Sequence, residues 1–178
     1  VIFRATSQWF ISIDRNLREQ ALEDIKKVKW VPGVGEARIT GMVESRPEWC
    51  ISRQRLWGVP IPVFYCASCK GIVMNENIQK TVLAEVKNRG TDVWFEEDAA
   101  HFIPQGTTCP ACGHTQFVKE KDILDVWFDS GVSHQAVLRG NPLLSYPADL
   151  YLEGSDQHRG WFQSALLSAE AIGAGRPY

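Results

Sequence analysis

Four of the five cysteines stand in two C-x-x-C pairs, which is the spacing of a metal site. Cys66 and Cys69 form one pair, and Cys109 and Cys112 form the other. The two-residue spacer lets both sulfurs of a pair reach the same ion, and the glycine that follows each pair permits a left-handed turn. We therefore predict a structural zinc ion, one per chain, held by four thiolates and without an open coordination position for catalysis.

Other possible states of these cysteines are two disulfides, unpaired core thiols, or a zinc site in which His114 replaces one cysteine. Disulfides form in oxidising compartments, and the N-terminal sequence lacks the basic region, apolar core and cleavage site of a secretory signal peptide. A redox site needs only one C-x-x-C motif, whereas a zinc ribbon with two knuckles accounts for both pairs. Cys50 stands alone, and we interpret it as a small buried residue.

A second constellation, DLYLEGSDQHRGWF at residues 149–162, gathers charged, amide and aromatic side chains. LYLE predicts the end of a buried strand, and SDQHRGWFQSALLSAEAI predicts an amphipathic helix. The pattern puts Glu153 and Gly154 at the strand end, and Asp156 and Gln157 at the helix start. If the sheet is of the open α/β type, this is where its ligands would bind. A carboxylate suits hydroxyl or ammonium groups of a ligand, and an amide both donates and accepts.

Asp156 also has a purely structural interpretation, because aspartate is a favoured N-cap residue. His158 and Arg159 are read as solvent-facing helix residues and are left out of the site. Arg53 and Arg55 either meet phosphates or RNA, or pair with some of the 21 acidic residues.

Hydrophobic periodicity and turn residues predict the elements that hold these groups in place. The expected elements are a strand at 8–13, a helix at 15–28 capped by Asp14, a helix at 36–44, a strand at 62–66 and a helix at 75–89 ended by Gly90. The first helix should bury one face, formed by Leu17, Ala21, Leu22, Ile25 and Val28. We expect the side chains of Trp49 and Trp57 to pack against other residues of the chain.

Composition places the chain among soluble globular proteins, with 178 residues, 44% hydrophobic and 22% charged. The net charge of -2 excludes a generally basic protein that coats nucleic acid, although a local contact with RNA stays open. No apolar run approaches the roughly 20 residues of a membrane span. Because the sequence starts without Met and in the middle of a strand-like stretch, we expect it to be a piece of a larger protein.

Three longer stretches resemble the class I aminoacyl-tRNA synthetases for branched aliphatic amino acids. They are RPEWCISRQRLWGVPIP at 46–62, DILDVWFDSG at 122–131 and YLEGSDQHRGWF at 151–162. Together they are most similar to the isoleucyl-tRNA synthetases, and the opening FRATSQWF resembles the point where those chains leave the editing domain. Valyl-tRNA synthetases are similar around WCISRQ but lack EGSDQHRGWF, so a valyl fragment is the nearest alternative.

The resemblance implies an α/β fold, part of a Rossmann-like nucleotide-binding domain with an inserted zinc-ribbon connective module. Residues 1–45 would be the exit from the editing insertion with connecting helices, and residues 46–62 a linker of the catalytic region. Residues 63–120 would be the zinc-ribbon insertion, and residues 121–178 a strand and helix of the second nucleotide-binding half.

The resemblance also implies an activity. The family activates isoleucine with ATP to an aminoacyl adenylate and transfers the acyl group to tRNA(Ile), in the cytoplasm. Its phosphate-stabilising motifs, His-x-Gly-His and Lys-Met-Ser-Lys-Ser, are absent from this sequence. We therefore expect the chain alone to be inactive, and to be a monomer without membrane contact.

By the same resemblance, Glu153, Gly154, Asp156 and Gln157 contact the adenylate. Trp161 lines the pocket for the amino-acid side chain, with Trp127 as a second candidate; the alternative for Trp161 is a place in the core. A different class of function is a zinc-ribbon module that binds RNA or protein without chemistry. The EGSDQHRGWF turn argues against that module, because a plain ribbon needs no acidic strand-to-helix site.

Overall fold

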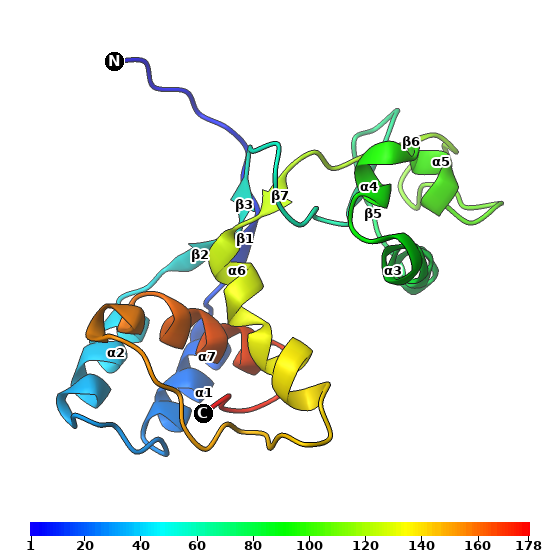
Figure 1. Ribbon diagram of the computed structural model, residues 1–178. Coiled ribbons are helices and arrows are strands. Elements are labelled where there is room, and N and C mark those ends of the chain that lie inside the picture. Colours follow the sequence, from blue (N-terminus) through cyan, green and yellow to red (C-terminus); the bar gives the residue numbers. More distant parts are fainter. The chain divides into compact units, whose positions relative to one another are not determined.

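The chain folds into two compact units (Figure 1). The computed structural model describes residues 1–178, apart from the side chain of Arg15. The first unit, here the helical unit, comprises residues 1–52 and 125–178. The second, here the cysteine unit, comprises residues 53–124.

The helical unit begins with a short antiparallel pair of strands followed by two helices. Strand β1 (Phe10–Ser12) pairs with β2 (Glu48–Cys50), with Ile11 opposite Trp49. Its helical elements are α1 (Arg15–Ile25), α2 (Val34–Glu44), α6 (Val126–Gly131), the π-helical turn η1 (His134–Arg139), the 3₁₀ turn η2 (Ser155–His158) and α7 (Trp161–Ala171).

Helix α1 forms as its sequence predicts. The side chain of Asp14 accepts a hydrogen bond from the Leu17 N–H at 3.0 Å, which satisfies one of the donors that a helix N-terminus leaves open. Leu17, Ala21 and Ile25 are buried in the core, and they share one face at helical spacing. The helix ends at Ile25, one turn earlier than predicted.

Helix α7 is buried around its whole circumference, so the predicted amphipathic helix is wrong. Every residue from 162 to 170 is buried, including two serines, a glutamine and a glutamate. The polar groups are accommodated by specific partners: the Ser168 hydroxyl donates to the Gly131 carbonyl at 2.8 Å, and Gln163 accepts from Arg46. Gly131 allows this approach, because a Cβ there would lie 2.9 Å from the Ser164 carbonyl oxygen.

The predicted strand before this helix is also absent from the described residues. Residues 150–154 have no regular secondary structure, and Leu150 and Leu152 are 74% and 76% exposed. A strand requires a neighbouring strand to pair with, and the described residues provide none here. The helix itself starts at Trp161, after the separate turn η2, so Asp156 is not in its first turn.

The cysteine unit is built on a three-stranded antiparallel sheet. Strand β4 (Phe64–Cys66) lies between β5 (Ile72–Val73) and β6 (Phe117–Lys119). The helices are α3 (Glu76–Arg89), α4 (Val93–Glu96) and α5 (Ala99–Phe102), and β3 (Ser52–Arg53) pairs with β7 (Ile123–Leu124). The small sheets and helices make the chain mixed α/β, whereas the doubly wound nucleotide-binding sheet stays a prediction.

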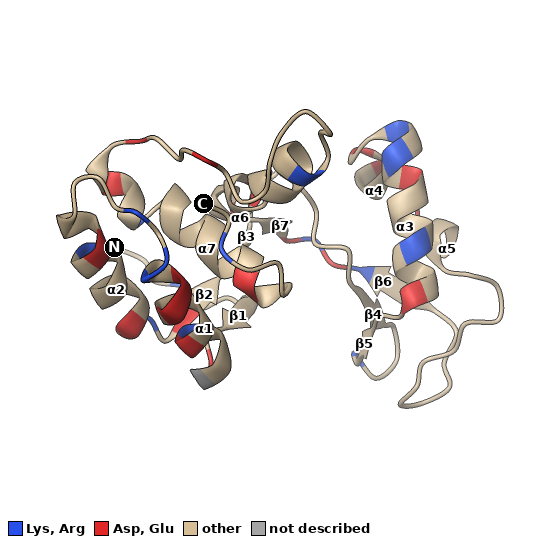
Figure 2. Cartoon of the chain, turned by 90° about the horizontal axis from the view of Figure 1, so that it is seen from below, with Lys and Arg blue, Asp and Glu red and all other residues tan. Residues whose placement is uncertain are grey.

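Helix α3 confirms its predicted ends. The Asn75 side chain accepts from the Ile78 N–H at 3.0 Å, and Gly90 follows the last turn with φ of 79°, a backbone angle that favours glycine. Acidic and basic residues are interspersed along this helix (Figure 2), with an acidic residue in its first turn and two basic residues in its last. No helix among the described residues has the length and apolar character to cross a membrane.

A pair of carboxyl groups joins α1 to α7 in the helical unit. The side chain of Asp24 hydrogen-bonds to Glu170, and it also accepts from the Arg176 N–H at 2.8 Å and from Lys27. Glu170 is buried, and burial together with the neighbouring Asp24 raises the pKa of its carboxyl to about 7. One oxygen of Glu170 has no hydrogen-bond partner within the described residues. The pair therefore holds a proton at pH values where an ordinary glutamate is ionised.

We expect Glu170→Gln to flatten the pH dependence of stability between about pH 4.5 and 7. In the folded chain Glu170 keeps a proton that the unfolded chain releases above its ordinary pKa of 4.5. The free energy of unfolding of the unmodified chain should therefore fall as pH rises through this window, by on the order of 1–3 kcal/mol. Urea unfolding at several pH values measures this, with the exposed Glu23→Gln as control. If the free energy of unfolding changed with pH equally in Glu170→Gln and in the unmodified chain, the raised pKa of Glu170 would be contradicted.

Candidate functional site

The four paired cysteines meet in the cysteine unit at the ends of two turns of the same kind. In the first, the Lys70 N–H donates to the Cys66 carbonyl at 3.0 Å; in the second, the Gly113 N–H donates to the Cys109 carbonyl at 2.8 Å. Lys70 and Gly113, the residues that directly follow each pair, both have positive φ, of 62° and 74°. In the first pair it is therefore Lys70, rather than the predicted Gly71, that makes the left-handed turn.

The sulfur atoms fit a four-coordinate metal ion. All four Sγ atoms lie within 4.8 Å of one another, with Cys66 Sγ 3.5 Å from Cys112 Sγ and Cys69 Sγ 3.6 Å from Cys109 Sγ. A tetrahedron of thiolates about 2.3 Å from zinc has sulfur–sulfur separations of about 3.8 Å, whereas a disulfide needs about 2.0 Å. These distances do not fit the alternative of two disulfides, and the cluster does not include His114.

One of these thiols is prepared for deprotonation by the turn itself. The backbone N–H of Cys69 points at the Cys66 sulfur and lowers the pKa of the Cys66 thiol to about 6, against the opposing effect of burial. A thiolate is the form that binds a metal ion. The bias toward the binding form applies to Cys66 only: at Cys112 the His114 backbone N–H lowers the thiol pKa, but the neighbouring sulfurs and burial together raise it.

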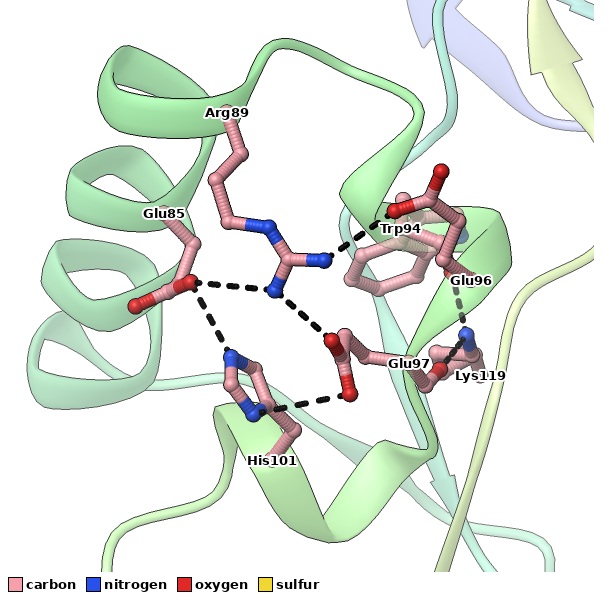
Figure 3. Close-up of polar contacts among 7 residues, drawn as sticks. All are labelled: Glu85, Arg89, Trp94, Glu96, Glu97, His101 and Lys119. Atoms are coloured by element: carbon pink, nitrogen blue, oxygen red, sulfur yellow. Dashed lines mark hydrogen bonds and ion pairs between the residues drawn. The ribbon is translucent and has the colours of Figure 1, made fainter.

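The insertion between the two cysteine pairs is held by a polar cluster (Figure 3). The Arg89 guanidinium from α3 contacts Glu97 at 2.7 Å and Glu96 at 3.0 Å. His101 from α5 lies 3.0 Å from Glu85 and 3.8 Å from Glu97. Exposed ion pairs contribute little one by one, but here they share partners and join α3 to the two short helices.

Lys119 of β6 completes this cluster on its buried side. Its ammonium donates to the carbonyl oxygens of Trp94 and Glu97, and it lies 5.5 Å from the centre of the Trp94 ring (Figure 3). Burial lowers the pKa of Lys119. This cluster is not among the features predicted from the sequence, although Glu85 and Arg89 stand at the i, i+4 spacing that indicates a helix ion pair.

The acidic turn of the helical unit presents two carboxylates to solvent. Glu153, Gly154 and Asp156 are all exposed. Glu153 accepts only weakly from the Gly154 N–H at 3.4 Å, and Asp156 accepts from the side-chain amide of Gln157 at 3.1 Å. Asp156 does not cap α7; instead, the Gln157 side-chain oxygen accepts from the Trp161 N–H at 2.9 Å. The capping alternative for Asp156 is therefore wrong, and its carboxylate can still accept hydrogen bonds from a ligand.

Two tryptophans lie next to this turn. Trp161 is half-buried, and its indole N–H donates to the Ser130 carbonyl at 3.0 Å and to the Ser133 hydroxyl at 3.2 Å. Trp127 of α6 is 43% exposed and covers Gly160, where a Cβ would lie 2.9 Å from the ring. The fold thus gathers Trp127, Gln157 and Trp161 around Gly160, three of the predicted site residues.

The predicted exposure or packing of four further residues is confirmed for two of them and wrong for the other two. His158 is buried rather than solvent-facing, because Gly35 of α2 leaves space for it: a Cβ at Gly35 would lie 2.8 Å from the His158 ring. Arg159 is exposed as predicted. Trp49 is buried in the core, whereas Trp57 is 92% exposed, so the packing prediction holds for Trp49 only.

Comparison with known proteins covers the whole chain. A family model described as tRNA synthetases class I (I, L, M and V) matches residues 1–178. The isoleucine--tRNA ligases of Syntrophotalea carbinolica and Geobacter sulfurreducens are 58% and 55% identical to the chain over 179 residues, which is 100% of the chain and 19% of each relative. That of Aquifex aeolicus is 57% identical over 181 residues, covering 98% of the chain and 18% of the relative. The chain therefore spans about a fifth of the length of these curated relatives.

We expect Gly160→Ala to destabilise the helical unit by about 1–3 kcal/mol, because overpacking a close contact forces its neighbours to move. The added methyl would lie 2.5 Å from the Gln157 side-chain oxygen as well as against Trp127. Thermal or urea unfolding measures the effect. Gly33→Ala is the matched control, since its Cβ would meet nothing within 4 Å. An unchanged midpoint for Gly160→Ala would show that Trp127 does not lie against this glycine.

Proposed function

Because the chain belongs to the class I tRNA synthetases, we propose that it is part of an isoleucine–tRNA ligase. Such an enzyme activates isoleucine with ATP and transfers the product to tRNA(Ile). The observation that carries the proposal is the identity of 54–58% to isoleucine--tRNA ligases along essentially the whole chain. A cytoplasmic location and a monomeric state belong to the same proposal.

Two alternatives are less well supported. The relatives reported above are all isoleucine--tRNA ligases, which favours the isoleucyl over the valyl enzyme. A zinc-ribbon module that only binds RNA or protein would account for the cysteine unit. It would not account for the helical unit, which the synthetase family model also matches.

We propose that residues 150–153 become a strand of the Rossmann-like sheet when the rest of the enzyme is present. Leu150 and Leu152 are exposed, whereas Tyr151 between them is half-buried, which is the alternation of a strand. Within the described residues, no backbone hydrogen bond involves positions 150–153. The segment thus has the apolar surface and the unused backbone groups that neighbouring strands would cover and pair.

The proposed ligand lies at the carboxyl end of that strand, where open α/β sheets bind nucleotides. Glu153 and Asp156 have oxygens that can accept from ribose hydroxyls or from the ammonium of isoleucine. Gly154 allows the backbone to approach the adenylate, and Gln157 orders the turn and adds an amide. Trp161 and Trp127 line the side-chain pocket, where one methylene is worth only about 1–3 kcal/mol of discrimination.

Zinc is the metal we propose for the cysteine unit. Cys66, Cys69, Cys109 and Cys112 would hold one ion as a structural site, since four thiolates use all of its coordination positions. The ion would join the turn after β4 to the turn before β6. Its contribution is to the fold of this unit rather than to the chemistry of the reaction.

We expect the purified chain to contain about one zinc per molecule under reducing conditions. Cys69→Ser should lower the zinc content and destabilise the cysteine unit, because metal binding and folding are coupled. Cys50→Ser is the matched control, since Cys50 lies in the helical unit and outside the cluster. Elemental analysis and thermal unfolding with and without a chelator measure both effects. A folded chain without zinc and with four reactive thiols would disprove the site.

In the full-length enzyme, isoleucine-dependent pyrophosphate exchange tests the proposed function, and Asp156→Ala tests the proposed site. We expect the substitution to slow exchange by about 10- to 150-fold, because it removes one charged hydrogen bond that contributes roughly 1.5–3 kcal/mol. The melting temperature should change little, because the Asp156 carboxylate contacts only the Gln157 amide among the described residues.

Asp149→Ala is the matched control, a nearby exposed acid that accepts only from Ser145. Normal exchange with Asp156→Ala would contradict the binding role of this residue. Exchange that depends on valine, and not on isoleucine, would instead support the valyl alternative. The isolated chain supplies the baseline, since we propose that it is inactive without the phosphate-stabilising motifs.

A further inference from the structure

We propose that Tyr151 and Ser133 are positioning residues that fix the indole of Trp161 and thereby set one wall of the amino-acid pocket. The proposal rests on the function proposed above. Neither residue belongs to the predicted site, and neither needs to touch the substrate. Their role follows from three contacts within the helical unit.

The first contact restrains the face of the indole. The rings of Tyr151 and Trp161 stack with centroids 3.9 Å apart and planes 26° apart, the shortest ring separation among the described aromatic pairs. Tyr151 is itself held on other sides by Tyr178 at 4.8 Å and Phe162 at 6.0 Å. The surface on which Trp161 rests is therefore packed against the core, unlike the exposed leucines on either side of Tyr151.

The second and third contacts restrain the edge of the indole. The Trp161 N–H is shared between the Ser130 carbonyl at 3.0 Å and the Ser133 hydroxyl at 3.2 Å. The Ser133 oxygen also lies 3.4 Å from the Tyr151 hydroxyl. A serine hydroxyl can accept one hydrogen bond and donate another, so Ser133 links the two aromatic side chains. Rotation of the indole would break either the stack or these hydrogen bonds.

Trp127 differs from Trp161 in this respect. Its indole N–H makes no hydrogen bond among the described residues, and 43% of the residue is exposed. Its ring lies against Gly160, and no hydrogen bond or ring stack among the described residues restrains it. Of the two tryptophans, Trp161 is therefore the fixed wall, and Trp127 is the adaptable one. A pocket that must distinguish isoleucine from valine by one methylene depends on a wall that does not move.

Kinetics of the full-length enzyme test this assignment. Tyr151→Leu removes the stack and should raise the KM for isoleucine by about 2- to 12-fold, the range for an aromatic pair, without changing the KM for ATP or kcat. The preference for isoleucine over valine should fall as well. Tyr151→Phe keeps the stack and should restore the isoleucine KM to within about 2-fold. Ser133→Ala removes one of two acceptors and should give an intermediate increase.

Tyr146→Phe is the matched control. It also removes a tyrosine hydroxyl of the helical unit, one that donates to the Gly175 carbonyl at 3.0 Å and does not contact Trp161. We expect it to leave the isoleucine KM unchanged. Equal rises in the KM values for isoleucine and ATP with Tyr151→Leu would indicate a general structural effect and overturn the proposal.

A measurement without activity separates this proposal from the proposed function. In protein labelled with 5-fluorotryptophan, the fluorine resonance of Trp161 is assigned with Trp161→Phe. Ser133→Ala and Tyr151→Leu should shift or broaden it, and Tyr146→Phe should not. If the unsubstituted enzyme shows no isoleucine-dependent exchange, the proposed function fails while this test still stands. If Tyr151→Leu does not fold, Ser133→Ala decides, and an unchanged Trp161 resonance in that variant refutes the positioning role.

Discussion

The burial of α7 is the constraint on which the helical unit depends. A helix that is enclosed on all sides leaves no solvent-facing stripe, so each polar residue on it needs a partner in the core. Ser168 has one in the Gly131 carbonyl, and Gln163 has one in Arg46. Gly131 brings α6 close enough for this, and the same approach carries Trp127 onto Gly160 at the start of α7. The proposed pocket is thus a consequence of how the core closes around one helix.

The cysteine unit solves a different problem, since its sheet is small and its helices are short. Its core is a group of rings, in which Trp94 lies 5.1 Å from Phe64 and 5.3 Å from Phe102. Lys119 caps this group by binding two carbonyl oxygens that short helices leave without partners. A metal ion at the four sulfurs would add a covalent-like restraint to the opposite ends of the same strands. Small folds commonly need such a restraint, because their buried surface is limited.

Local features were predictable from the sequence, and features that depend on distant segments were not. Asp14 and Asn75 cap their helices through N–H groups three residues away, and Gly90 acts on the turn just before it. The cysteine cluster joins two distant segments, and it was predictable because each knuckle is a local motif whose C-x-x-C spacing occurs twice in the sequence. The burial of His158 depends on Gly35, more than a hundred positions away in sequence. The predicted strand at 150–153 is not formed, because no strand among the described residues pairs with it. The spacing of residues along the sequence does not indicate which distant segment lies against His158 or whether a strand pairs with residues 150–153.

The pairing of β3 with β7 has a consequence for the history of the chain. These strands lie where the polypeptide enters the cysteine unit, near Arg53, and where it leaves it, near Leu124. A segment that begins and ends in two paired strands can be shortened, enlarged or exchanged without rerouting the backbone on either side. Evolution can therefore treat these 72 residues, from 53 to 124, as a cassette, varying their length and ligands while the helical unit stays the same.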